Sequence, residues 1–414
     1  MHGMTVGYKR TYHDKRLRMN VEQNGTSVWL VGGEDVRLRI PIAKKLIEMG
    51  FDVAIAGSEA STPFDLEGIE YHQYSLKRGV APVADQRSLR ELISLFKEYR
   101  PAVVHAFDTK PALLVPKAAQ KAGLKTVVRT VTGMGYVYSS RSPLALSLRI
   151  IYRYLQKKAS AFADRTIFQN EDDMEYFLSS RLSTVQRSIL VRGSGVDMDI
   201  LENNIPGPKT LSTLCHELDL DGAVVITMVA RMVRHKGVVE FLQAARETRK
   251  LIPNCRFLLI GPLATEGAQA VSKKLIKSYE DDVSWLGHRS DVPAILRLSD
   301  MFVLPSYYRE GVPRVLLEAG ALGLPLITTD MPGCRDVVRD GKEGALVPPR
   351  DAVALSKAIQ RFACSPELRN QLGTNAQSRV RKDFSLSKVA AAYAQVYREL
   401  MQKPEATIKE NVYV

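Results

Sequence analysis

The sequence predicts an α/β protein built from two doubly wound domains. Short apolar runs of strand length alternate with helical segments through both halves of the chain, which is the pattern of parallel sheets covered by helices. A length of 414 residues also exceeds what one core serves, so two domains of about 150–200 residues are expected. We place a basic N-terminal tail at residues 1–25, a first domain at 26–200, a linker at 201–220, a second domain at 221–384 and a last helix at 385–401.

The composition is that of an ordinary globular protein, with 45% hydrophobic and 25% charged residues. No apolar run reaches 18 residues, so no transmembrane helix is expected. The first twenty residues are polar and basic without an apolar core, which argues against a secretory signal. Four cysteines lie far apart without a C-x-x-C pair, so we expect a reducing cytoplasm and no zinc site.

The net charge of +13 calls for an anionic partner, namely nucleic acid, a membrane surface or a small substrate. No helix-turn-helix, zinc-finger or RNP pattern is present, so nucleic acid is not expected. An anionic membrane is favoured by the helix expected at residues 142–160, which carries an apolar and a basic stripe: Leu144, Leu148, Ile151 and Leu155, and Arg149, Arg153 and Lys157. An ordinary helix that buries its leucine face is the alternative, and the two interpretations are compatible.

The first domain opens with a β-α-β pattern. A strand at residues 27–32 runs into Gly32 and Gly33, a helix follows at about 36–49, and the next strand spans 51–56. The turn G-G-E-D is not the G-x-G-x-x-G of a dinucleotide site. The glycine pair permits a ligand to approach the backbone, and a tight turn alone is the alternative.

Further along the first domain, a helix at 87–99 precedes a strand at 103–107 that carries His105 and leads to Lys110. The strand at 126–131 is followed by a loop with glycines on both sides of Met134. A strand at 165–169 ends at Asn170, a good N-cap for a helix with acids in its first turn.

The second domain begins with a strand at 224–229 and a loop with Arg231 and Lys236 before a helix that starts at Val238. Two cations beside a helix N-terminus indicate a diphosphate site, and two ordinary surface cations are the alternative. A strand at 256–260 ends at Gly261, and a strand at 283–287 is followed by His288 and Arg289.

The stretch from Met301 to Asp330 is predicted to form a strand, a loop, a helix and a strand. The helix is expected at residues 314–322, closed by Gly323 and Pro325. Glu310 lies in the loop and Glu318 in the helix. A carboxylate accepts two hydrogen bonds side by side and grips a vicinal diol, while the helix N-terminus suits a phosphate. We interpret the stretch as a nucleotide-sugar clamp, with solvated surface charges as the alternative. Helices are expected at 351–362, 366–383 and 385–401.

The segment EGVPRVLLEA, with Glu310 and Glu318 at E-x7-E spacing, resembles the motif of retaining glycosyltransferases of the GT-B fold, family 4. Together with TTDMPGCRD at 328–336 it is similar to the bacterial branch that builds lipid-linked oligosaccharides and surface polysaccharides. The R-x4-K-G motif from Arg231 and the G-x-GVD motif before Met198 also match, so the resemblance covers about residues 26 to 400.

This resemblance implies two Rossmann-like domains facing across a cleft, with the last helix crossing back to the first domain. It further implies retaining transfer of a hexose or N-acetylhexosamine from a nucleotide donor, most simply UDP, to a lipid-linked saccharide at the inner face of the plasma membrane. No cofactor or metal is expected. Asp197 and Asp199 form a D-x-D motif, but the order of elements around it is wrong for the metal motif of the other large glycosyltransferase fold.

The resemblance assigns roles to particular residues. The catalytic set is Glu310, Arg231, Lys236 and His105. The donor-binding set is Glu318, Gly311, Val312, Gly32, Gly33, Gly261, His288 and Arg289. The acceptor set is Gly133, Met134, Gly135 and Lys110.

Two other functions stay open at this point. A nucleotide-sugar 2-epimerase shares the architecture but needs acid–base carboxylates over the sugar and lacks this E-x7-E motif. A non-catalytic basic protein that binds nucleic acid or membrane would show salt-dependent binding and no affinity for nucleoside diphosphates.

Overall fold

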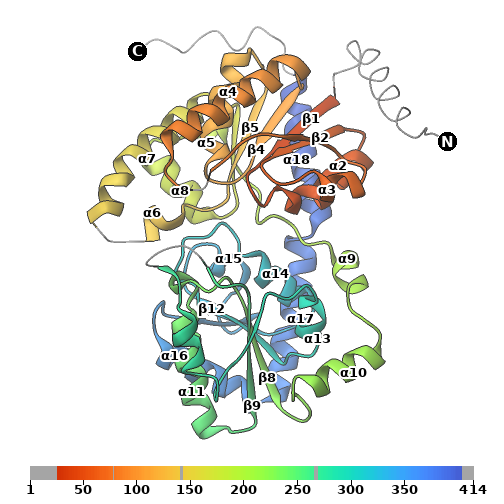
Figure 1. Cartoon of the computed structure of the whole chain (residues 1–414), viewed down its shortest axis with the longest axis vertical. Coiled ribbons are helices and arrows are strands. Elements are labelled where there is room, and N and C mark those ends of the chain that lie inside the picture. Colours follow the sequence, from red (N-terminus) through yellow and green to blue (C-terminus); the bar gives the residue numbers. More distant parts are fainter. Residues whose placement is uncertain (1–25, 78, 140–142, 265–268, 403–414) are drawn as a thin grey trace, which may run out of the picture. The chain divides into compact units, whose positions relative to one another are not determined.

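The computed structural model describes residues 26–77, 79–139, 143–264 and 269–402. These residues form two parallel β-sheets with helices packed on them, as the alternation of strands and helices predicted (Figure 1). The expected tail at 1–25 lies outside the described residues.

The first sheet has the order β3-β2-β1-β4-β5-β6-β7 among the described strands. Its strands are β1 (Ser27–Val31), β2 (Asp52–Gly57), β3 (Glu70–Gln73), β4 (Val103–Ala106), β5 (Val127–Val131), β6 (Arg165–Phe168) and β7 (Ser188–Leu190). The order reverses direction between β1 and β4, where Leu30 lies beside His105 in parallel register. Ligands of open α/β sheets bind outside the carboxyl ends of the strands at such a switch point.

Helices cover this sheet because its side chains alternate between two apolar faces. Trp29 and Val31 of β1 are buried against helices α4 (Pro82–Tyr99) and α5 (Pro111–Ala122), which pack side by side (Figure 1). The other helical segments of this half are η2 (Val36–Arg39), α2 (Ile40–Glu48), α3 (Thr62–Leu66), α6 (Gly135–Ser139), α7 (Pro143–Ala161), α8 (Glu171–Ser179) and η3 (Val185–Arg187).

The second sheet has the order β10-β9-β8-β11-β12-β13 among the described strands. Its strands are β8 (Val224–Val229), β9 (Cys255–Ile260), β10 (Ser284–Gly287), β11 (Met301–Leu304), β12 (Leu326–Thr329) and β13 (Gly344–Val347). All of their pairings are parallel. The switch point of this sheet lies between β8 and β11, so the loops that follow these two strands are brought together.

The helices of the second sheet form two layers. α11 (Val238–Leu251) packs against α16 (Ala352–Ala363), and α14 (Arg314–Ala321) packs against α17 (Pro366–Asp383), with the strands between them (Figure 1). The shorter segments are η4 (Arg234–Lys236), α12 (Lys273–Lys277), α13 (Val292–Arg297) and α15 (Cys334–Val337). Apolar side chains of these layers and of the strands form one continuous core.

The stretch expected as a linker at 201–220 is largely helical. It contains the end of α9 (Met198–Asn203) and the whole of α10 (Pro208–Glu217). Asp197 caps α9 through its side chain, which accepts from the backbone amides of Asp199 and Ile200. Leu214 of α10 is buried in a cluster with Leu220 and Val225, because an amphipathic helix at this position covers the end of the sheet.

The last helix, α18 (Leu386–Met401), ends against the first sheet, as the resemblance implied. Tyr393 and Tyr397 lie edge-on to the ring of His105 in β4, and the guanidinium of Arg398 donates to the carbonyl of Met49. The chain thus returns to its first sheet after completing the second.

Helix α7 exposes apolar side chains that were expected in its buried face. Ile151 is 57% and Leu155 is 43% exposed, while Ala145 and Gln156 are buried. The first residue of the expected helix, Ser142, and the side chain of Leu144 lie outside what the structure describes. The expectation failed because this helix has apolar residues on more than one side, so that periodicity alone did not identify the packed face.

The described chain divides into two compact units. The first contains the described residues up to Arg129, residues 159–165 and the described residues from Tyr393. The second contains the described residues of 130–158 and 166–392. The domain limits inferred from the sequence, at 200 and 221, differ from the boundaries of these compact units and stay a prediction.

Candidate functional site

The candidate site of the second unit lies at the switch point of its sheet. The loop after β8 carries Arg231 and Lys236, and the loop after β11 carries Glu310. Because neighbouring parallel strands end at the same edge, residues 74 positions apart meet there. Lys236 Nζ lies 2.6 Å from Glu310 Oε1, and both side chains are largely buried.

The Glu310 carboxylate has a second partner in the same loop. Ser306 Oγ donates to Glu310 Oε1 over 2.9 Å. Ser306 directly follows Pro305 at the end of β11 and is fully buried. The carboxylate is thus held by one cation and one hydroxyl, and hydrogen bonds to a charged group are stronger than those between neutral groups.

Contacts between the two loops hold this arrangement. A side chain at Gly237 (φ +80°) would stand 2.1 Å from the carbonyl oxygen of Pro305, so only glycine allows the two backbones to approach so closely. The amide of Tyr307 donates to the carbonyl of His235 over 3.0 Å, and the rings of His235 and Tyr308 stack at 4.5 Å. Backbone and ring contacts therefore join the loop with Lys236 to the loop that carries Glu310.

Helix α14 begins at the end of the Glu310 loop. Its N-cap, Pro313, has no side chain to cap the first turn, so the N-terminal amides of the helix are available to an anion. Glu318 lies one turn further on and accepts from Arg314 Nε over 2.8 Å. Val312 is buried beneath this turn, while Arg231 is exposed on the neighbouring loop. Cations, amides and two carboxylates thus surround one edge of the sheet.

The loop at residues 132–135 reaches the backbone of Glu310. Gly133 and Glu310 form an antiparallel bridge, the amide of Gly311 donates to the carbonyl of Thr132 over 3.0 Å, and the amide of Gly135 donates to the carbonyl of Arg309 over 3.1 Å. Met134 between the two glycines is buried. The structure thus brings the predicted acceptor loop into direct contact with the predicted catalytic loop.

Gly261, His288 and Arg289 of the predicted donor-binding set follow β9 and β10, on the other side of β8 from β11. A side chain at Gly261 would stand 1.9 Å from the carbonyl oxygen of Ala230, and the indole of Trp285 donates to the carbonyl of Gly261 over 3.0 Å. His288 is exposed, and Arg289 pairs with Asp291 over 2.8 Å. The loop after β8 is thus held by the end of β9 on one side and by the loop after β11 on the other.

The predicted residues of the first unit lie at the switch point of their own sheet. The amide of Gly33 donates to Asp108 Oδ2 over 3.1 Å, and Tyr74 donates to the carbonyl of Gly32 over 2.7 Å. Lys110 Nζ donates to Asp85 Oδ1 over 2.5 Å and to the carbonyl of Lys77 over 2.6 Å. Lys110 therefore has a structural partner already, which weakens its assignment to an acceptor.

His105 does not fit the role of a sugar contact. Its side chain has no exposed surface and lies 2.5 Å, through Nδ1, from the hydroxyl of Tyr397 in α18. Burial also lowers the pKa of the imidazole well below its ordinary value, so the ring is neutral. His105 points into the core beneath the strand end, where it anchors the last helix.

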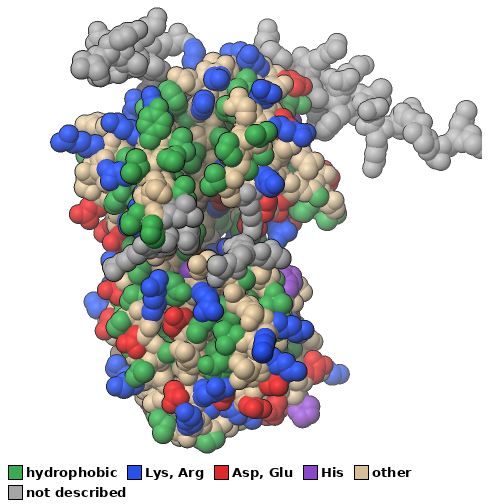
Figure 2. All heavy atoms as spheres, turned by 60° about the vertical axis from the view of Figure 1, so that its left-hand side comes forward, with side chains coloured by type: hydrophobic (Ala, Val, Ile, Leu, Met, Phe, Trp, Pro, Cys, Tyr) green, Lys and Arg blue, Asp and Glu red, His purple; other side chains and the backbone are tan. Residues whose placement is uncertain are grey.

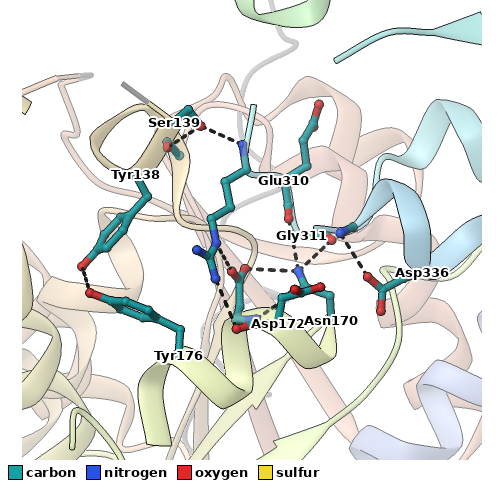
Figure 3. A network of polar contacts seen from close by, with 12 residues as sticks. Tyr138, Ser139, Asn170, Asp172, Tyr176, Glu310, Gly311 and Asp336 are labelled. Carbon is teal, nitrogen blue, oxygen red and sulfur yellow. Dashed lines mark hydrogen bonds and ion pairs between the residues drawn. The ribbon is translucent and has the colours of Figure 1, made fainter. Parts of the chain in front are cut away.

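Several residues of the site were not assigned from the sequence. Ser306 binds Glu310 directly, and Asn170 donates to the carbonyls of Glu310 and Gly311 over 3.1 and 2.9 Å (Figure 3). Asn170 was recognised only as a helix N-cap, which it also is. A polar residue two positions after the end of a buried strand was the available signal in both cases.

Among the described residues no cluster of three or more histidine, cysteine, aspartate or glutamate side chains has the spacing to hold a metal ion. No helix in the described part of the chain is long and apolar enough to cross a membrane.

Comparisons with known proteins show which proteins this chain resembles. A family model described as glycosyl transferase 4-like matches residues 28–170, and one described as glycosyl transferases group 1 matches residues 217–379. The Staphylococcus aureus capsular polysaccharide biosynthesis glycosyltransferase CapM is 27% identical, over 88% of this chain and 96% of its own length. The Escherichia coli UDP-Gal:α-D-GlcNAc-diphosphoundecaprenol α-1,3-galactosyltransferase is 29% identical, over 79% of this chain and 83% of its own length.

Solved structures show the same fold. Anabaena Alr3699/HepE in complex with UDP-glucose has a TM-score of 0.74 and 17% identity, covering 90% of this chain and all of that one. Sucrose-phosphate synthase from Thermosynechococcus elongatus also has a TM-score of 0.74, with 22% identity over 90% of this chain and 98% of that one.

Proposed function

The chain belongs to the glycosyltransferases of the GT-B fold, with a glycosyl transferase 4-like first half and a group 1 second half, and we propose that it moves a hexose or N-acetylhexosamine from UDP to a lipid-linked saccharide, with retention at the anomeric carbon. The single observation that carries the proposal is the Glu310 carboxylate held by Lys236 and Ser306 at the switch point of the second sheet. Two relatives, a capsular polysaccharide enzyme and a UDP-galactose transferase named for a diphosphoundecaprenol acceptor, support the choice of donor and acceptor.

Each group of the site has a task in this reaction. Arg231, Lys236 and the N-terminal amides of α14 bind the diphosphate and stabilise the charge that grows on it as the sugar–phosphate bond breaks. Lys236 offers three N–H donors, of which the structure commits one to Glu310. Glu318 binds the ribose diol and Glu310 the hydroxyls of the donor sugar.

The proposed transfer needs no nucleophile from the protein. The bond between the anomeric carbon and the β-phosphate oxygen breaks, and the acceptor oxygen forms its bond to that carbon from the same face. The departing phosphate takes the proton of the acceptor hydroxyl. The charge on the phosphate is met by fixed cations and amides, so this route needs no metal ion.

Titration calorimetry with UDP, GDP and ADP in the presence of a chelator tests the donor site. UDP is expected to bind, and Arg231→Ala to weaken it by roughly 10- to 100-fold, since a hydrogen bond to a charged group contributes about 1.5–3 kcal/mol. Failure of all three nucleotides to bind would refute the proposed donor site, and binding only with added metal would refute its metal independence.

Transfer is then measured with UDP-sugars and a short-chain polyprenyl-diphosphate saccharide. Glu310→Ala is expected to lower the rate by about 10²–10³-fold while the protein stays folded, because it removes the contact to the donor sugar. Glu280→Ala, which changes an exposed glutamate of the same unit, serves as the control. Full activity of Glu310→Ala would refute its assignment, and inverted stereochemistry of the product would refute retention.

We also propose that α7 places the enzyme on the inner face of the plasma membrane. Ile150 is 74% and Tyr154 is 61% exposed, beside Ile151 and Leu155. Residues 143–158 contain no acidic residue, and the basic side chains of Arg153 and Lys157 are exposed among the apolar ones. Figure 2, which brings the α7 side of Figure 1 forward, shows hydrophobic side chains gathered on this part of the surface with lysine and arginine around them. Apolar side chains ringed by cations fit the headgroup region of an anionic bilayer.

Vesicle sedimentation tests the membrane proposal. The protein is expected to bind phosphatidylglycerol vesicles and not phosphatidylcholine vesicles, and Ile150→Glu with Tyr154→Glu to abolish binding. Leu251→Glu, at an equally exposed leucine (70%) at the end of α11, is the matched control. Unchanged binding of the α7 variant, or an equal loss in the α11 variant, would refute a role for α7.

A further inference from the structure

Asn170, Asp173 and Arg309 form a clasp on the backbone that carries Glu310. Arg309 Nε lies 2.6 Å from Asp173 Oδ1, and its second guanidinium nitrogen donates to the carbonyl of Asp172 over 3.2 Å. Asp173 is fully buried, which is rare for a carboxylate and costs free energy unless a cation is fixed beside it. The ion pair of Asp173 and Arg309 is therefore a structural contact and not a solvated pair of surface charges.

Asn170 joins the clasp to the backbone itself. Its amide nitrogen donates to Asp173 Oδ2 over 3.1 Å as well as to the carbonyls of Glu310 and Gly311, and Figure 3 shows it between α8 and that backbone. Its own Oδ1 accepts from the amide of Asp173 over 2.8 Å. One side chain thus connects the start of α8 to two successive carbonyls of the Glu310 loop.

Two other stretches of backbone pack closely against the Glu310–Gly311 backbone. A side chain at Gly133 would stand 2.5 Å from the nitrogen of Gly311, and one at Gly333 would stand 2.1 Å from the oxygen of Gly311. Beside these contacts, the amide of Arg309 donates to Ser139 Oγ over 2.8 Å. The backbones at Gly133 and Gly333 therefore both pack against the backbone of Glu310 and Gly311.

We propose that Asn170, Asp173 and Arg309 are positioning residues, which press the Glu310–Gly311 backbone against the loop at 132–135 and so set where the Glu310 carboxylate stands during sugar transfer. The inference rests on the proposed function of Glu310. None of the three side chains needs to touch a substrate. They act through Glu310, and through Gly133 they connect its position to that of the predicted acceptor loop.

The clasp predicts that loss of the Arg309 side chain lowers the rate of sugar transfer and leaves UDP binding nearly unchanged. In the proposed function the diphosphate is bound by Arg231 and Lys236, which are not members of the clasp, whereas Glu310 acts on the sugar. Arg309→Ala is therefore expected to lower kcat for transfer by about 100-fold, the effect of misplacing a reacting contact by about 1 Å. The Kd for UDP is expected to stay within about threefold of the wild-type value.

The experiment compares Arg309→Ala, Arg309→Lys, Asp173→Asn and the double variant Arg309→Ala/Asp173→Asn, with thermal unfolding measured for each. Arg309→Lys keeps the charge, and its kcat is expected to be about tenfold higher than that of Arg309→Ala. The double variant is expected to lose no more than about twofold beyond Arg309→Ala, because both changes break one contact. Arg192→Ala is the matched control, since Arg192 pairs with Glu171 at the same helix start without touching the Glu310 loop.

The outcomes separate this inference from the proposed function. Absence of UDP binding and transfer in the wild-type protein overturns the proposed function. A wild-type enzyme that transfers sugar, together with Arg309→Ala at the wild-type rate, overturns the clasp alone. Additive losses in the double variant, or a parallel loss of UDP affinity and rate, would also overturn it, because they indicate general destabilisation.

Discussion

Replacing Gly133 by alanine tests the contact between the 132–135 loop and the Glu310 backbone. Gly133 has φ +113°, and an added Cβ would stand 2.5 Å from the nitrogen of Gly311, 2.7 Å from the carbonyl carbon of Glu310 and 2.9 Å from the carbonyl oxygen of Arg309. All three neighbours are backbone atoms, so no flexible side chain can move away from the new methyl group.

The size of the effect follows from this geometry. Restoring an ordinary 3.4 Å contact with the nitrogen of Gly311 requires a separation about 0.9 Å larger than the present 2.5 Å. The positive φ adds about 1–3 kcal/mol of backbone strain. Because a displacement of about 1 Å in a reacting group costs about 100-fold in rate, Gly133→Ala is expected to lower kcat for transfer by about that factor.

Steady-state transfer kinetics, UDP calorimetry and urea unfolding are measured for Gly133→Ala and for Gly50→Ala. Gly50 has φ +91° and nothing within 4 Å of an added Cβ, so it carries the same kind of strain without the contact. Both variants should lose stability through the backbone strain, Gly133→Ala the more because of its added contacts, and only Gly133→Ala should lose turnover. Wild-type kcat in Gly133→Ala would refute the reasoning, as would an equal loss of kcat in Gly50→Ala.

Two further predictions concern buried groups. Tyr397→Phe removes the hydroxyl that pairs with His105, so it should lower the free energy of unfolding by about 1–3 kcal/mol in urea titrations and leave transfer unchanged; a large loss of transfer would restore His105 to the catalytic set. Burial raises the pKa of Asp173 to about 6 against the lowering effect of Arg309 and with a small raising effect of Asp172. Transfer should therefore fall as the pH drops through about 6, since protonation removes the ion pair with Arg309. The contribution of Asp173 to folding stability has the opposite sign: the folded state binds this proton more tightly than the unfolded state, so that contribution rises as the pH falls from about 6 towards 4. A pH–rate profile of the wild type that is flat down to pH 5, or one that Asp173→Asn leaves unchanged in shape, would contradict this prediction.

The order and type of the elements were set by local sequence. The helix after Glu310 was expected at residues 314–322 and spans Arg314–Ala321, and the helices at 366–383 and 385–401 lie where they were expected. Prolines, glycines and short apolar runs decide where helices and strands begin and end within a few residues of their own position. Their effect can therefore be predicted without the rest of the molecule. For the same reason the Glu310 loop, Lys236 and the helix starts beside them were recognisable as one kind of site.

The packed faces and the partners were decided by the tertiary structure. His105 lies in a strand, as predicted, but Tyr397 of α18, 292 residues further along the chain, packs on it and it is buried. Ile151 and Leu155 belong to an apolar stripe that the fold leaves in solvent, because the helix presents its other side to the core.

By itself the sequence determined the two parallel sheets, the loops at their switch points and the carboxylates and cations that these loops carry, because each of these depends on residues close together in the chain. Only the tertiary structure decided that Asn170 and Asp173 close on the Glu310 loop, about 140 residues away. A helix N-cap and an acid in its first turn are explained locally by the helix, so nothing in their own neighbourhood signals a second partner. Such contacts arise only when two sheets and their loops have been folded, since they depend on distances in space that no spacing along the chain encodes.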